Sequence, residues 1–220
     1  MANCYVVSAK RATAVSHALT VTSEGLKAIQ EVPIFGRIAT LNIFRSKNDT
    51  CDSLVLLTCK YHLAVLGWDR EKKEIFTRAS GMVAERVGRP SESGMITCVH
   101  PNGLIALRLY DGNLKMVEWD DGKDLRSYNV RVEDMGIVDL QFLSPTAAHD
   151  RPRMCYIYHD AKGRHLKTIE INQLEKDIKL LSHQDNIESE ATMIIPVPYP
   201  IGGCIILGQE TILYNRWVNG

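Results

Sequence analysis

The chain has 220 residues, 45% of them hydrophobic, and can bury a core of its own in one large or two small domains. Its 26 basic and 26 acidic side chains cancel, so it lacks the long-range positive field that supports non-specific nucleic-acid binding. No signal peptide or membrane span is predicted, and six scattered cysteines without a C-x-x-C pair favour a reduced, intracellular protein.

The first predicted elements are short β-strands. A pair of strands is suggested around Glu24-Gly25, and alternation of apolar and polar side chains predicts a strand at Arg37–Phe44. Two apolar runs then predict a hairpin, and a more polar run predicts a fourth strand: Leu54–Lys60, His62–Trp68 and Glu74–Arg78. A loop rich in glycine, serine and charge, Ser80–Ser93, follows.

The clearest local signal is Leu104–Trp119, in which two apolar runs flank Asp111-Gly112. Asp-Gly between such runs predicts a β-hairpin closed by a type I′ turn, whose two central residues both have positive φ. Strands predicted at Met95–Val99 and Leu125–Val132 complete a second group of four.

Two further groups follow the same order. The third group consists of these predicted strands: Ile137–Leu143, Arg153–Tyr158, His165–Ile171 and Ile178–Ser182. Helical spacing of apolar residues makes Asn172–Ser182 the one candidate helix, which we rank below an outer strand with a loop. The fourth group consists of these predicted strands: Thr192–Pro196, Cys204–Leu207 and Thr211–Tyr214.

The opening strands of the four groups recur at 58, 42 and 56 residues, centred on Ile38, Ile96, Val138 and Ile194. Groups of four antiparallel strands with such spacing are typical of propeller blades, whereas a β-sandwich does not repeat the order from inner to polar outer strand. We therefore predict an all-β fold, a partial β-propeller of four-stranded antiparallel blades, with about three and a half blades of a seven-bladed type.

An unclosed propeller leaves strand edges and apolar blade surface exposed. The chain is accordingly expected to belong to a larger fold or to pair with something, and in isolation to self-associate instead of unfolding as a cooperative monomer.

No active site is predicted. The seven histidines are spread through the chain, and no cysteine or carboxylate partners stand at zinc-ligand spacing: His17, His62, His100, His149, His159, His165 and His183. Neither a nucleophile elbow nor a nucleotide-binding loop occurs. Gly202-Gly203 is interpreted as a turn, and the acidic run of Asp185, Glu188 and Glu190 as a solvated loop instead of a general-acid pair.

Three other features suggest function more weakly. Trp68-Asp69 and Trp119-Asp120 end the third strands of their groups, as in WD-repeat propellers, but the Gly-His partner is missing and both tryptophans are interpreted as packing residues. The loop that carries Arg86, Arg89, Ser91 and Ser93 is interpreted as a connection between blades, held by Pro90 and Gly94. Partners nevertheless dock on such loops.

Several stretches carry a family resemblance: Tyr5–Val15, Gly88–Gly94, Leu107–Lys115, Gly163–Ile171 and Ile187–Tyr214. In this order they resemble the N-terminal propeller of a family that includes the large subunit of the damage-specific DNA-binding protein, the large cleavage-and-polyadenylation factor and a splicing-factor subunit. The similarity is closest to the damage-binding subunit. Two departures stand out: about one hairpin fewer between Val15 and Thr22, and an unrelated ending after Tyr214. We expect residues 1–220 to be one incomplete propeller domain with an abridged first blade (1–35), from a truncated product or an incomplete gene model.

The resemblance implies a non-catalytic scaffold of the nucleus, also present in the cytoplasm, that recruits substrate receptors to a cullin-RING ubiquitin ligase. The cullin would bind through propellers that this chain lacks, and damaged DNA would be reached through a receptor. The resemblance implies no cofactor, metal or catalytic residue, and it transfers no receptor-contact residue to this chain. Direct binding of damaged DNA or RNA is the alternative; an enzyme is a third reading, which turnover dependent on His159 or His165 would support.

Overall fold

A computed structural model describes residues 32–34, 36–45, 49–86, 88–119, 124–145 and 151–216. The strand pair expected around Glu24-Gly25 lies outside these residues, as does nearly all of the abridged first blade (1–35). In the described ranges no helix combines the length and the hydropathy of a membrane span.

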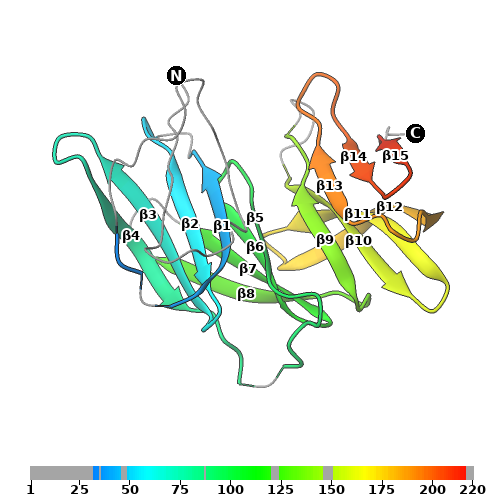
Figure 1. The fold of residues 1–220 in the computed structure, drawn as a ribbon, viewed down its shortest axis with the longest axis horizontal. Coiled ribbons are helices and arrows are strands. Elements are labelled where there is room, and N and C mark those ends of the chain that lie inside the picture. Colours follow the sequence, from blue (N-terminus) through cyan, green and yellow to red (C-terminus); the bar gives the residue numbers. More distant parts are fainter. Residues whose placement is uncertain are drawn as a thin grey trace. The chain divides into compact units, whose positions relative to one another are not determined.

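The described residues form β-strands joined by turns and loops (Figure 1). In chain order the strands are β1 (Ile38–Phe44), β2 (Ser53–Thr58), β3 (His62–Asp69), β4 (Glu74–Met82), β5 (Ile96–Val99), β6 (Leu104–Tyr110), β7 (Asn113–Trp119), β8 (Leu125–Arg131), β9 (Ile137–Phe142), β10 (Arg153–Asp160), β11 (Gly163–Asn172), β12 (Asp177–Ile187), β13 (Met193–Pro196), β14 (Cys204–Leu207) and β15 (Ile212–Asn215). They pair in sequence order into three sheets of four strands and one sheet of three. The all-β class and the antiparallel blade pattern predicted from the sequence are confirmed.

The first sheet, β1–β4, contains the hairpin predicted between the two apolar runs. Leu54 pairs with Leu66 and Leu57 with Leu63 across the β2–β3 hairpin. All six residues of β2 are buried, whereas most of β4 is exposed or half-buried. This is the expected change from a buried middle strand to a polar outer strand. The outer strand is four residues longer than predicted and takes up the start of the predicted Ser80–Ser93 loop.

The second sheet, β5–β8, is built on the predicted hairpin, in which all of β6 is buried. The turn at Asp111-Gly112 is where the sequence placed it, but its predicted type is wrong. Gly112 has a φ of 80°, whereas Asp111 is not among the described residues with positive φ. A type I′ turn needs positive φ at both positions, so only the glycine uses its conformational freedom here.

The third sheet, β9–β12, is the largest. Tyr158 pairs with His165 in the β10–β11 hairpin, and the pairing continues to Asp160 and Gly163, which shortens the expected loop to a tight turn. The candidate helix at Asn172–Ser182 is absent because β12 runs from Asp177 to Ile187 and pairs with β11. A strand is favoured there because β11 offers a free row of backbone groups for pairing.

The fourth sheet, β13–β15, has two different faces. Ile194, Ile206 and Leu213 lie opposite one another on one face and pack against the third sheet. Met193, Leu207 and Ile212 align on the other face, where Met193 and Ile212 are exposed. Both faces are therefore apolar, although only one is covered by described residues.

The chain divides into two compact units, one of residues 1–85, 101–103 and 118–126 and the other of residues 86–100, 104–117 and 127–220. Within the second unit the inner strands β5, β9 and β13 are neighbours in succession. One apolar core lies between the second and third sheets, around Met116, Leu140 and Met154. Another lies between the third and fourth sheets, around Ile157 and Ile206. The opening strands predicted from the repeat are thus the inner strands of these blades.

Candidate functional site

The segment that carries Arg86, Arg89, Ser91 and Ser93 is a connection from β4 to β5, as interpreted from the sequence. The Asp111 N–H donates to the Arg89 carbonyl (3.0 Å), and the Ser91 N–H donates to the Leu109 carbonyl (3.2 Å). The segment therefore pairs with β6 beyond the last residues that β5 pairs. Arg89 forms an ion pair with Glu92 (2.5 Å), but both side chains are exposed, so the pair adds little stability.

The two tryptophans of the Trp-Asp pairs also have structural positions. Trp119 is buried within the first unit, where the Phe44 ring meets it edge-on at 5.4 Å between centroids. The Arg78 guanidinium lies 4.5 Å from the centre of the Trp119 ring. Asp49 fixes Arg78 through two hydrogen bonds of 2.5 and 3.1 Å. Trp68 is half-buried in β3, so both residues pack as the sequence suggested.

The acidic run that the sequence grouped as one loop is divided in the structure. Glu188 accepts hydrogen bonds from the Thr211 hydroxyl and from the backbone N–H groups of Gln209, Glu210 and Thr211. These bonds, that from the Thr211 hydroxyl first, lower the pKa of Glu188. Its carboxylate thus closes the β14–β15 turn, whereas Glu190 is exposed to solvent.

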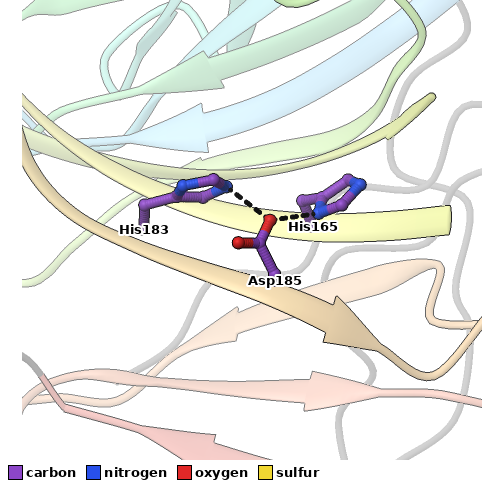
Figure 2. A group of neighbouring side chains, drawn as sticks. All are labelled: His165, His183 and Asp185. Carbon is purple, nitrogen blue, oxygen red and sulfur yellow. Dashed lines mark hydrogen bonds and ion pairs between the residues drawn. The ribbon is translucent and has the colours of Figure 1, made fainter. Parts of the chain in front are cut away.

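Asp185 belongs to a different group, together with two of the seven histidines. Its Oδ1 atom lies 2.7 Å from His165 Nδ1 and 3.1 Å from His183 Nε2 (Figure 2). The three donor atoms lie within 4.8 Å of one another. We call His165, His183 and Asp185 the histidine–aspartate cluster. Of the residues that the structure describes, no others converge in this way with three potential metal-ligand atoms.

Strand register explains why these side chains meet. Lys167 pairs with His183, but the register of β12 against β11 shifts between the Leu166–Gln184 and Arg164–Ile187 pairs. Asn186 has a φ of 55° at this irregularity. A β-bulge inserts an extra residue and re-aims a neighbouring side chain. Here the bulge accompanies the approach of Asp185 to His165 on the adjacent strand.

A second carboxylate holds the other nitrogen of the His165 ring. Asp160 Oδ1 lies 2.9 Å from His165 Nε2, and Asp160 ends β10 at the tight β10–β11 turn. The His165 side chain is only 3% exposed, whereas Asp160 and Asp185 are 45% and 60% exposed. Its hydrogen bonds to Asp160 and then Asp185 raise the pKa of His165. The buried ring therefore lies between two solvated carboxylates that favour positive charge on it.

Tyrosine and lysine side chains border the cluster. The Tyr158 ring stacks on His165 at 5.0 Å between centroids, and its hydroxyl lies 3.2 Å from His183 Nε2. Lys167 donates to both oxygens of Asp134, at 2.7 and 2.8 Å. Burial acts to lower the pKa of Lys167, but its bonds to Asp134 outweigh burial and raise it. Asp134 therefore balances the nearby positive charge.

The remaining described histidines lie elsewhere. His159 follows Tyr158 on β10 but faces away, where its Nδ1 atom lies 3.0 Å from the Gly136 carbonyl. His62 is exposed in the first sheet, and His100 is buried beside Phe142 at 5.2 Å. His17 and His149 lie outside the described residues. The sequence named His159 or His165 as the residues on which an enzyme would depend, whereas the structure places His165 with His183.

The missed signal was the spacing His183-x-Asp185, which puts both side chains on one face of a strand. It was overlooked because the sequence interpretation ended the outer strand at Ser182, before these residues. With β12 extended to Ile187, the antiparallel pairing brings that face beside His165.

The open face of the fourth sheet is a second candidate surface. Met193, Ile195, Ile212 and Tyr214 are exposed on it, and Ile212 retains 77% of its accessible surface. Contiguous exposed apolar residues of this kind mark contact surfaces more often than ordinary solvent-facing surface. Gly202 and Gly203, with φ of 69° and 78°, lie in the β13–β14 connection, consistent with the predicted turn.

Comparison with known proteins gives a consistent result. Residues 3–219 match the model of the RSE1/DDB1/CPSF1 first beta-propeller. The chain is 42% identical over 197 residues to DNA damage-binding protein 1 of Oryza sativa subsp. japonica, an alignment of 88% of this chain and 18% of that protein. It is 38% identical over 195 residues to DNA damage-binding protein 1 of Caenorhabditis elegans, across 89% of this chain and 17% of that protein. DNA damage-binding protein 1a of Arabidopsis thaliana is 40% identical over 197 residues, across 88% and 18%.

The chain thus spans less than a fifth of the length of these curated relatives. The similarity predicted from separate stretches of the sequence is confirmed over nearly the whole chain, and the blade-like sheets agree with it. The chain belongs to the RSE1/DDB1/CPSF1 first beta-propeller family.

Proposed function

We propose that this protein is a non-catalytic scaffold that recruits substrate receptors to a cullin-RING ubiquitin ligase. The observation that carries the proposal is the family match over residues 3–219, together with relatives named DNA damage-binding protein 1. The sheets support it, since they combine well-packed cores with exposed apolar side chains such as Ile212. The cullin would bind through propellers outside this chain, and the chain itself would serve as one incomplete propeller domain.

The link to DNA damage would be indirect, through a receptor that contacts the lesion, and would place the protein in the nucleus as well as the cytoplasm. Equal numbers of basic and acidic side chains favour this indirect route. Direct DNA or RNA binders gain most of their affinity from positive charge, and that affinity falls steeply with salt.

Affinity capture tests the scaffold. The tagged chain is incubated with nuclear extract, and co-purifying proteins are quantified by mass spectrometry. Leu107→Asp is the matched control, because Leu107 is 0% exposed and a charge buried there disrupts the sheet. Substrate receptors enriched by the intact chain over Leu107→Asp support the proposal. Chaperones captured equally by both chains, with no receptor, contradict it.

Fluorescence anisotropy with labelled duplexes tests the nucleic-acid alternative. The scaffold proposal expects no binding of ultraviolet-irradiated or intact DNA by the purified chain at physiological salt. Tight binding to irradiated DNA that weakens steeply between about 50 and 200 mM salt would instead favour direct recognition.

A further inference from the structure

We propose that the histidine–aspartate cluster is a binding site for a divalent transition-metal ion of the zinc type. The ligands are His165 Nδ1, His183 Nε2 and Asp185 Oδ1, supplied by the adjacent strands β11 and β12. This proposal goes beyond the scaffold function and does not depend on it.

The donor set fits such an ion. Two imidazole nitrogens and one carboxylate oxygen are ligands that zinc takes in sites with an open fourth position. Tetrahedral zinc with bonds of about 2.0–2.2 Å places its ligand atoms about 3.3 Å apart. The Asp185 oxygen lies 2.7 and 3.1 Å from the two ring nitrogens, and all three donor atoms lie within 4.8 Å of one another, so side-chain rotations that even out these separations would bring the atoms to zinc distances. Figure 2 shows both rings directed at this oxygen.

The surroundings supply what a zinc site needs beyond its ligands. Metal-bound histidines commonly donate their second N–H to a carboxylate, which orients the ring and raises its basicity. Asp160 occupies that position at His165 Nε2, 2.9 Å away. Asp160 and Asp185 place two negative charges beside the buried His165 ring, and the ion would replace the proton that these carboxylates favour on it.

Access and an open coordination position are also present. Asp185 and His183 side chains are 60% and 34% exposed, so an ion reaches the cluster from solvent. The Tyr158 hydroxyl, 3.2 Å from His183 Nε2, is placed to hydrogen-bond a water on the ion. Lys167 does not oppose the ion with an unpaired charge, since Asp134 accepts two of its hydrogen bonds.

An ion at this position would join the outer strand β12 to β11 at the irregularity beside Asn186, where ladder pairing is interrupted. Its expected role is structural, because a bound ligand stabilises the folded state by mass action. Zinc at about 100-fold above its Kd should raise the Tm by about 5–10 °C for a chain of this size.

The test is zinc titration of the purified full chain against a chromophoric chelator. The compared chains are the unchanged chain and the variants His183→Ala, Asp185→Asn, Asp160→Asn and His62→Ala. His62 is an exposed histidine of the first sheet and provides the matched control. We expect zinc affinity to fall at least about tenfold in His183→Ala and Asp185→Asn, and about 10–100-fold in Asp160→Asn, with His62→Ala unchanged.

Two readouts separate the site from adventitious binding. Substitution of the ion by Co²⁺ should give a visible spectrum of nitrogen and oxygen ligation without thiolate-to-metal bands. The urea midpoint of each variant, measured in chelator, should match that of the unchanged chain. If His183→Ala is less stable, the zinc affinity of Asp185→Asn, at the more exposed position, decides the test. Unchanged affinity in both ligand variants, equal loss in His62→Ala, or thiolate bands in the cobalt spectrum would overturn the proposal.

Discussion

The third sheet, β9–β12, is packed on both faces, whereas described residues cover only one face of the fourth sheet, β13–β15. On the third sheet Met154 faces one apolar core and Ile157 the other. On the fourth sheet Ile206 is buried against the third sheet, but Ile212 on the opposite face is exposed. Both sheets follow one side-chain pattern, apolar toward either face. Apolar side chains on both faces therefore indicate that a blade packs between two neighbouring sheets. They do not indicate whether both neighbouring sheets are present.

The largest expected contrast between the two sheets is in core truncation. Ile157→Ala removes a fully buried side chain and should lower the free energy of unfolding by about 2–5 kcal/mol, because a cavity remains. Ile212→Ala, at a 77% exposed position, should change it by less than about 0.5 kcal/mol. Urea denaturation of both variants measures the difference. Equal losses would mean that the open face of the fourth sheet is covered in solution.

The junction of the two sheets should be sensitive to pH. Asp139 on β9 accepts a hydrogen bond from the Ile194 N–H of β13 at 2.7 Å. Burial, partly offset by this and other hydrogen bonds, raises the pKa of Asp139 from 3.8 to about 6. Between these values the folded state holds the proton more tightly, so stability present at lower pH is lost as pH rises through about 6. The loss is roughly 3 kcal/mol.

Urea midpoints measured from pH 4 to pH 7 check this prediction. Asp139→Asn keeps one acceptor oxygen but cannot ionise, so its stability should vary less over that range. If the variant and the unchanged chain lose stability in parallel, another group causes the dependence.

The sequence predicted the sheets well because each strand carries its own signal. Leu104–Tyr110 is apolar throughout, and Asp111-Gly112 marks the turn that follows it, so local residues determine both position and pairing. Spacing between Ile38, Ile96, Val138 and Ile194 then gave the inner strands. What failed locally was the turn type, since φ at Asp111 depends on how the two strands approach each other.

The histidine–aspartate cluster could not be predicted in the same way. His165 and Asp185 are 20 positions apart, and their contact depends on strand register and on a bulge near Asn186. The alternation of apolar and polar side chains does not reveal a bulge, because one extra residue shifts the alternation by one position and leaves the composition unchanged. The open face was the reverse case. Exposed apolar blade surface was expected from the sequence, and β13 and β15 carry apolar side chains on both faces, of which described residues cover only one.

A third contrast between the two sheets is expected in self-association. The open face of the fourth sheet should pair chains at micromolar concentration, since Ile195 on β13 and Ile212 on β15 are exposed on the same face of the sheet, one on each side of β14. The double variant Ile195→Asp, Ile212→Asp should weaken association by about 10–100-fold, as expected from the loss of one or two buried apolar contacts. Sedimentation velocity measures it.

Leu174→Asp is the control, because Leu174 is 94% exposed at the β11–β12 turn of the third sheet. It should leave association unchanged. A monomeric unchanged chain, or an equal effect of the control, would contradict a role for the open face.

Thiol labelling gives the smallest expected contrast and reports local opening. Cys155 on the third sheet and Cys204 on the fourth are both buried, with their sulfurs 3.7 Å apart. Cys98 lies in the core between the second and third sheets, and burial raises the pKa of its thiol. Because one face of the fourth sheet is uncovered, its detachment should cost less than global unfolding and should expose Cys155 and Cys204 together.

We therefore expect the exposed Cys59 to react first, Cys155 and Cys204 to react later at equal rates, and Cys98 to react at least about tenfold more slowly than that pair. Mass spectrometry of peptides after timed alkylation in native buffer separates the four sites. Equal rates for Cys98 and Cys204 would show that the sheets open as one cooperative unit. In that case the difference between the third and fourth sheets would be one of surface exposure only and not of stability.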